Sequence, residues 1–244
     1  MKKIAIVILI ALSWCVCHQP GKVVSKTSKI HMIDSTLDAI QDTQYLAYLE
    51  PIKTELETQL NEAIGYAPKD LEVYQPECPM LNWASDALYE MAKQLCPEQV
   101  DMAVVNIGGM RCNWGAGNIT FRHVFELMPF DNELVVLTMT GKEILALCDV
   151  FAKCGGQGVA GLRMSASKGV LRSAKIAGKD VVPEAYYTVA TSDYLSQGND
   201  GMTPLKNYEA MWKSERKIRD LYIEYIQQMK TVEAKVDGRM NVCL

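Results

Sequence analysis

Histidine is scarce in this chain, and paired cysteines are missing beyond its first residues. The 244 residues include 3 histidines and 8 cysteines. From residue 19 onward no cysteines form a Cys-x-x-Cys pair, and none lies near a histidine at a spacing typical of metal ligands. Since structural zinc sites are built from such arrays, the sequence predicts no zinc site.

Runs of one charge are missing as well. Lysine and arginine total 25, aspartate and glutamate total 29, and the net charge is −4 with the signs mixed along the chain. Nucleic-acid-binding domains carry basic patches, so we expect no nucleic-acid partner. The 49% of hydrophobic residues and 22% of charged residues are typical of a soluble globular protein, with one large domain or one domain plus an appendage.

The first seventeen residues have the pattern of an export signal. A short basic start precedes the apolar run from Ile4 to Leu12, which is too short to span a bilayer. Leu12-Ser13-Trp14-Cys15 resembles a bacterial lipobox, although Trp14 is bulkier than the residue usual at that position. We therefore predict a lipoprotein signal peptide over residues 1–17 with Cys15 acylated, and Cys17 is the alternative site. Two incidental thiols in a discarded peptide would explain the pair equally simply.

Export defines the expected surroundings of the mature chain. Residues 18–32 are polar and predict a tether that leads to a domain over residues 33–244. The expected location is the periplasm or outer membrane of a Gram-negative-type bacterium, with the membrane reached through the lipid anchor. Disulfides persist there, but the sequence leaves open whether the remaining cysteines pair or are buried thiols.

Hydrophobic spacing predicts an α+β domain in which helices flank one mixed sheet, rather than a strictly alternating doubly wound fold. One helix should run from Tyr45 to Ile64 and end at Gly65, with a kink or a new start at Pro51. Residues 155–158, Gly-Gly-Gln-Gly, predict a flexible break, and Gly178-Lys179 a hairpin turn. The other predicted helices cover Met80–Leu95, the segment from Gly141 to Lys153, and the stripe from Ile218 to Met229. The predicted strands are Met102–Asn106, Leu134–Met139, Leu162–Ser165, Val170–Ile176 and Tyr186–Ala190, and Phe121–Leu127 is a short segment between strands.

The strand from Met102 is followed by a glycine-rich loop that ends in a cation. The loop reads Asn106-Ile107-Gly108-Gly109-Met110-Arg111. Glycine permits positive φ and close approach of a ligand, and arginine forks a phosphate or carboxylate well. A strand-to-turn junction with a surface arginine is the simpler explanation of these residues alone.

Two more loop motifs follow in order, Pro129-Phe130-Asp131-Asn132 and the segment Ser192–Gly201. Together with the glycine loop they resemble the C-terminal domain of the 5′-nucleotidase family. The resemblance extends over residues 33–239. It includes Glu77–Ala87, similar to the family's helix start E-x-x-x-G-N-L-x-x-D-A, and Val236-Asp237-Gly238-Arg239-Met240, similar to its terminal D-G-R-I.

The resemblance implies a nucleoside pocket. It places an aromatic clamp at Phe130 and Tyr194, a ribose contact at Asp200, and polar contacts at Asn106 and Arg111 beside Gly108 and Gly109. The chemistry suits those roles, because aromatic stacking contributes about 1–3 kcal/mol per base and a carboxylate can accept both ribose hydroxyls.

Each residue also has a plainer explanation. Phe130 would be a core ring beneath a proline turn, Tyr194 a half-buried residue at a strand end, and Asp200 the start of an Asx turn before Gly201.

Several positions depart from the family pattern. Tyr194 stands where phenylalanine is common, Asn199 and Leu81 replace glycines, and Tyr74-Gln75-Pro76 occupies the place of an additional phosphate-binding arginine. A weaker grip on phosphate, or phosphate contacts supplied elsewhere, is the expected consequence.

Family members pair this domain with a metallophosphatase domain whose D-x-H and G-N-H-[DE] motifs hold two metal ions. The three histidines, His18, His31 and His123, stand in neither motif. Two-metal hydrolysis needs many such ligands. We therefore expect a stand-alone nucleotide-recognition domain that binds no cofactor and is inactive alone. A separately encoded metallophosphatase would hold the divalent metals and hydrolyse the phosphate ester. A lipid-anchored nucleoside-binding protein without a catalytic partner is the main alternative, and a relic that binds nothing is a third.

Overall fold

The computed structural model describes Val23, residues 25–35 and residues 42–243. The expected signal peptide and Cys15 lie outside the described residues. Residues 25–33 form neither helix nor strand and are exposed. The chain divides into two units, Met1–Glu50 and Pro51–Leu244. No helix within the described residues is long and apolar enough to cross a membrane.

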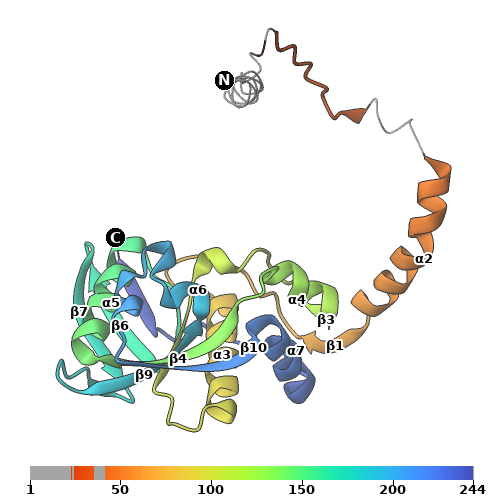
Figure 1. The fold of residues 1–244 in the computed structure, drawn as a ribbon. Coiled ribbons are helices and arrows are strands. Elements are labelled where there is room, and N and C mark those ends of the chain that lie inside the picture. Colours follow the sequence, from red (N-terminus) through yellow and green to blue (C-terminus); the bar gives the residue numbers. More distant parts are fainter. Residues whose placement is uncertain (1–22, 24, 36–41, 244) are drawn as a thin grey trace, which may run out of the picture. The chain divides into compact units, whose positions relative to one another are not determined.

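A five-stranded mixed sheet forms the centre of the second unit (Figure 1). The strand order is β10 (Ala210–Lys217), β4 (Glu133–Thr140), β9 (Tyr186–Ser192), β2 (Met102–Val105) and β5 (Gly158–Ala160). Only β2 and β9 run parallel within this sheet, and each other neighbouring pair is antiparallel.

The central strand β2 is buried on both faces of the sheet. Successive side chains of a strand point to opposite faces, so each face can be followed separately. On β2, Ala103 and Val105 pack with α3 (Pro79–Leu95) and α7 (Ile218–Met229). Met102 and Val104 pack on the other face, where α5 (Gly141–Cys154) lies. A strand buried on both faces therefore reads as the continuous apolar run seen in the sequence.

Two smaller sheets complete the unit. β11 (Met240–Cys243), β6 (Leu162–Ser167), β7 (Val170–Ile176) and β8 (Lys179–Asp180) form one of them, and β1 (Ala63–Ala67) pairs with β3 (Gly117–Thr120) in the other. α5 contacts β4 and β9 of the central sheet and also β6 and β7. It is therefore enclosed between two sheets, which explains why its apolar stripe is fully buried.

The α+β class and the mixed sheet predicted from the sequence are confirmed. α3, β2, β4, α5, β7 and α7 lie within a residue or two of the expected bounds. The short segment Phe121–Leu127 forms helix α4, a type that was not predicted. A hairpin is found after β7, but its turn is one residue earlier than predicted: Ala177 and Gly178 form it, both at positive φ, and Lys179 already pairs with Ile176 in β8. The division of the strands over three sheets was not predicted, and neither were the strands β1, β3, β5, β8, β10 and β11.

The helix predicted to reach Ile64 ends earlier. α2 (Thr43–Leu60) is one helix with Pro51 inside it, so of the kink or new start expected there the new start is not found. Ala63–Ala67 forms strand β1 instead of a last helical turn. Ile64 is 4% exposed, and β1 pairs with β3. Gly65 lies inside this strand, where an added Cβ would overlap Ile226 Cγ2 of α7. Close packing against α7, rather than a helix end, explains this glycine.

Residues 155–158 were predicted as a flexible break and are tightly packed instead. Gly155 ends α5 in the left-handed conformation at φ 90°. An added Cβ on Gly156 would overlap the Pro76 carbonyl oxygen. Gln157 is only 7% exposed. The glycines permit a close backbone approach here.

The cysteines left open by the sequence form no disulfide among Cys78, Cys96, Cys112, Cys148 and Cys154, all within the described residues. Burial raises the pKa of the Cys148 thiol to about 12. Such a thiol stays protonated and behaves as a small apolar side chain.

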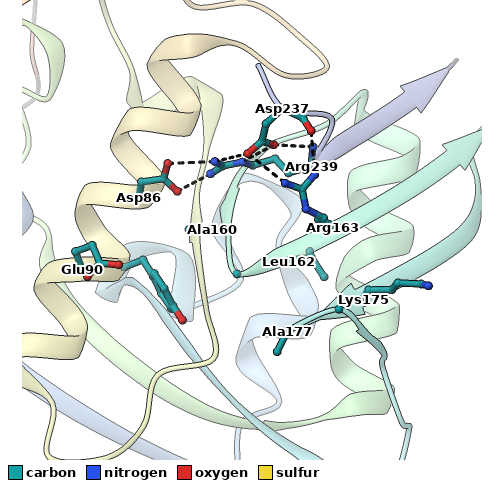
Figure 2. A pocket seen from close by; sticks show the side chains of 12 residues that line it. Asp86, Glu90, Ala160, Leu162, Arg163, Lys175, Ala177, Asp237 and Arg239 are labelled. Carbon is teal, nitrogen blue, oxygen red and sulfur yellow. Dashed lines mark hydrogen bonds and ion pairs between the residues drawn. The ribbon is translucent and has the colours of Figure 1, made fainter. Parts of the chain in front are cut away.

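A buried carboxylate joins the C-terminal segment to the start of α3. Glu77 is 6% exposed, and its Oε1 accepts hydrogen bonds from Asn82 Nδ2 at 2.7 Å, Asp237 N at 2.8 Å and Gly238 N at 3.2 Å. Figure 2 shows Arg239 between Asp86 of α3 and Asp237, with Nη1 2.5 Å from Asp86 Oδ1. The family-like motifs Glu77–Ala87 and Val236–Met240 are therefore bound to each other through Glu77 and Arg239.

Replacing Gly65 with alanine should lower the free energy of unfolding by about 1–3 kcal/mol, because the new methyl group overpacks the contact with Ile226. Chemical denaturation measures the loss. Gly115→Ala is the matched control, since no atom lies within 4 Å of its added Cβ. Equal effects at the two glycines would show that close packing against α7 is not what requires Gly65.

Glu77→Gln should lower the free energy of unfolding by about 2 kcal/mol, because the neutral amide loses charge-assisted hydrogen bonds in a buried site. Glu98→Gln, at an exposed position, serves as the control and should change little. Unchanged stability in Glu77→Gln would contradict the role given to this carboxylate.

Candidate functional site

The three predicted loop motifs meet at one edge of the central sheet. β2 and β9 are parallel, so the glycine loop after β2 and the segment after β9 leave the same edge. β4 runs antiparallel to β9, with Leu134 opposite Ser192. The start of β4, directly after Asn132, therefore lies at that edge too. Segments that are far apart in the chain become neighbours through strand direction alone.

These loops surround a cavity of about 410 Å³. Met128 and Asn132 also line it, and the sequence had not pointed to them as site residues. All seven residues predicted for the site line this one cavity: Asn106, Gly108, Gly109, Arg111, Phe130, Tyr194 and Asp200.

Asp200 connects the loops after β2 and β9. Its Oδ2 accepts a hydrogen bond of 2.5 Å from Asn106 Nδ2, and its Oδ1 accepts one of 2.9 Å from the Tyr194 hydroxyl. The hydrogen bond to Asp200 raises the pKa of Tyr194, because a phenolate would face the carboxylate. The carboxylate thus points across the cavity, in contrast to the Asx turn that the sequence also allowed.

The backbone at Asp200 is left-handed, with φ 52° and ψ 30°. Aspartate tolerates this region better than most residues, and such conformations cluster at functional sites. With this bend the carboxylate reaches Asn106, its hydrogen-bond partner in the glycine loop.

The glycine loop is shaped by a close contact and not by positive φ. Gly109 is absent from the positive-φ positions, and an added Cβ would lie 2.8 Å from Asn106 Oδ1. An added Cβ on Gly108 would lie 3.5 Å from Asp200 Oδ2, which is an ordinary contact. Glycine is therefore needed at position 109, so that Asn106 can fold back over the loop.

Gln157 supports this loop from behind, and sequence reasoning missed it. Its Oε1 accepts a 2.7 Å hydrogen bond from Ile107 N. β5 begins at Gly158, opposite Val105, so Gln157 lies at the same sheet edge as the loop. A polar residue between glycines was the only signal available in the sequence.

The two aromatic residues of the site are partly exposed, as a ligand contact requires. Phe130 is 36% exposed and Tyr194 39% exposed. A core position for Phe130 is therefore excluded. Arg111 lies near the same ring, with Cζ 6.0 Å from the Phe130 centroid, and its Nη1 donates to the Gly108 carbonyl at 3.2 Å.

Arg219 holds the loop that carries Phe130, and it too was not predicted. Its Nη2 donates to Asp131 Oδ1 at 2.7 Å, and its Nη1 to the Phe130 carbonyl at 3.4 Å. Hydrogen bonds from Lys217 and Arg219 lower the pKa of the Asp131 carboxyl. Arg219 follows β10, whose Lys217 lies opposite Glu133 at the start of β4. Arg219 lies in the predicted helix α7, but the start of this helix reaches the Phe130 loop through β10, a strand that the sequence did not reveal.

Two other cavities are less suited to a polar ligand with a ring. One, of about 330 Å³, is lined in part by Arg239, whose guanidinium is already paired with Asp86 and Asp237 (Figure 2). Another, of about 780 Å³, is lined mainly by apolar side chains such as Phe121 and Phe125. The cavity at the sheet edge alone among the three combines two aromatic rings, a carboxylate and an arginine.

Residues 23, 25–35 and 42–243 contain no group of three or more His, Cys, Asp or Glu side chains placed to hold a metal ion.

The chain is similar to known proteins along most of its length. Residues 61–207 match the family model for the 5′-nucleotidase C-terminal domain. Protein UshA of Escherichia coli (strain K12) is 26% identical over 220 residues, which cover 88% of this chain and 40% of UshA. A 5′-nucleotidase of Vibrio vulnificus is 30% identical over 178 residues, or 69% of this chain and 31% of that protein.

A solved structure shows the same fold. The crystal structure of a 5′-nucleotidase precursor from Thermus thermophilus is 26% identical, with a TM-score of 0.73 over 84% of this chain and 43% of that one. This chain thus spans less than half the length of the relatives that it matches. The family model covers more than half of the chain, and the solved structure shares its fold. The chain belongs to the 5′-nucleotidase family and carries its C-terminal domain.

Proposed function

We propose that this chain recognises a 5′-nucleotide through its nucleoside part, while a separate metallophosphatase hydrolyses the phosphate ester. The supporting observation is the cavity at the sheet edge, in which Phe130, Tyr194 and Asp200 lie together. Its volume, about 410 Å³, is within the range usual for small-molecule sites.

Each part of a nucleotide has a suitable partner in this cavity. A base stacks on aromatic rings at Phe130 and Tyr194. The ribose hydroxyls donate to Asp200, because each of its oxygens can still accept a hydrogen bond. Arg111 is the cation among the described residues that line the cavity, and it meets the phosphate. A single arginine gives a modest grip on phosphate, so most of the affinity comes from the nucleoside.

Hydrolysis is assigned to a partner on chemical grounds. Two-metal phosphate hydrolysis uses a set of carboxylate, imidazole and amide ligands, and this chain has neither a D-x-H nor a G-N-H motif. Divalent metals therefore belong to the partner in this proposal, and this chain binds no cofactor. Acylation at Cys15 would keep both proteins at the membrane of an exporting bacterium.

Phe130→Ala and Asp200→Ala should each weaken adenosine and AMP binding, Phe130→Ala by roughly 5- to 100-fold through lost stacking. Phe130 is 36% exposed, and the hydrogen bond between Tyr194 and Asp200 is exposed. Neither substitution therefore disturbs the core, and the thermal midpoint should change little. Titration calorimetry and thermal unfolding measure the two effects. Tyr186→Ala is the control, because Tyr186 is exposed and is the first residue of β9, at the end of the strand opposite the site. A large loss of stability with unchanged binding would mean that these are packing residues.

The purified protein should release no phosphate from AMP when divalent metal is added, because the expected metal ligands belong to the partner. A phosphate-release assay tests this, with Asp200→Ala in parallel to reveal contaminating enzyme. Turnover by the wild type that Asp200→Ala abolishes would contradict the division of labour. Co-purification of the lipidated chain with a metallophosphatase from native membranes supports the subunit role, and nucleoside binding without such a partner supports the plain binding protein.

A further inference from the structure

The Tyr194 hydroxyl has a specific partner inside the cavity. It donates a 2.9 Å hydrogen bond to Asp200 Oδ1, while Asn106 Nδ2 donates to Asp200 Oδ2. Each oxygen of this carboxylate therefore has one donor before any ligand arrives. An ionised carboxylate offers about four acceptor positions, so about one remains on each oxygen.

The two remaining acceptor positions match the chemistry of ribose. A ribonucleoside presents neighbouring 2′ and 3′ hydroxyls, each a donor, whereas a 2′-deoxyribonucleoside presents one. With both hydroxyls bound, each oxygen of Asp200 accepts two hydrogen bonds. With one hydroxyl missing, an acceptor that the site has aimed at the sugar stays unmatched, which costs binding free energy.

Tyr194 is held at both ends, although the residue is 39% exposed. Its backbone N donates to Asp193 Oδ1 at 2.8 Å, and its carbonyl accepts from Asn199 Nδ2 at 2.8 Å. The hydroxyl contact fixes the other end. The ring and the carboxylate are thus ordered before binding, so a ligand does not have to supply that ordering.

We propose that the Tyr194 hydroxyl is a specificity element: by donating to Asp200 it fixes the stacking ring and the free acceptors of the carboxylate together, and so selects ribonucleosides over 2′-deoxyribonucleosides. This inference rests on the proposed function of the cavity and adds the sugar that it selects. A phenylalanine at this position would stack equally well. It would leave the terminal torsion of Asp200, which has a broad energy profile, held by Asn106 alone.

Titration calorimetry of the wild type, Tyr194→Phe and the control Tyr186→Phe with adenosine and 2′-deoxyadenosine tests the inference. The wild type and the control should prefer adenosine. Tyr194→Phe should lose roughly five- to tenfold in affinity for adenosine and little for 2′-deoxyadenosine, as expected for about one hydrogen bond. The preference for ribose should therefore narrow by the same factor.

An unchanged preference in Tyr194→Phe, or an equal loss for both ligands, would overturn the inference and leave the proposed function standing. A wild type that binds neither nucleoside would overturn the proposed function, and the selectivity with it.

A second readout needs no ligand. In the wild type the hydrogen bond to Asp200 raises the pKa of Tyr194, and Asp200→Asn should bring it down, because the amide carries no charge to repel a phenolate. Carbon NMR of tyrosine labelled at Cζ follows this titration, and Tyr194→Phe assigns the signal. Identical titration in the wild type and Asp200→Asn would show that the hydrogen bond is not formed, and the inference would fail whatever the protein binds.

Discussion

The parallel pairing of β2 with β9 is the constraint on which the site depends. Parallel neighbours end at the same edge of a sheet, so the chain must deliver both the glycine loop and the Tyr194–Asp200 segment there. The antiparallel pairing of β4 with β9 brings the start of β4, and Phe130 before it, to the same place. In open sheets with parallel strands, ligands bind just beyond the carboxyl ends of the strands. This cavity lies just beyond the carboxyl ends of β2 and β9.

The outer strands of the same sheet position side chains that support the loops around the cavity. β5 starts at the shared edge, directly after Gln157, which contacts the glycine loop. β10 ends at that edge and leads directly into α7, whose first turn carries Arg219, which contacts the Phe130 loop. Both side chains bond backbone atoms of the loops that they hold. Loops that extend from central strands and are held by polar side chains next to the edge strands give a preformed cavity whose aromatic rings remain accessible.

Much of the fold was predictable because local pattern and tertiary packing agree. β4 and α7 have apolar spacings that match a strand and a helix, and both are found as expected. The helix predicted for Ala63 and Ile64 was wrong, because these residues continue the helical spacing of α2 but belong to β1, which pairs with β3, a strand more than fifty residues away. Gln157 and Arg219 were missed for a related reason, since their roles exist only once β5 and β10 have joined the sheet.

The sequence by itself determined the family. The loop motifs that carry Asn106, Phe130 and Asp200, in their order along the chain, were enough for the resemblance, because each motif is local and carries its own residues. The nucleoside pocket was what that resemblance implied. Only the tertiary structure decided how these residues meet. Asn106 and Asp200 are 94 residues apart and share a hydrogen bond because two strands run in the same direction. No local pattern encodes that direction, since it depends on how the whole sheet closes its core.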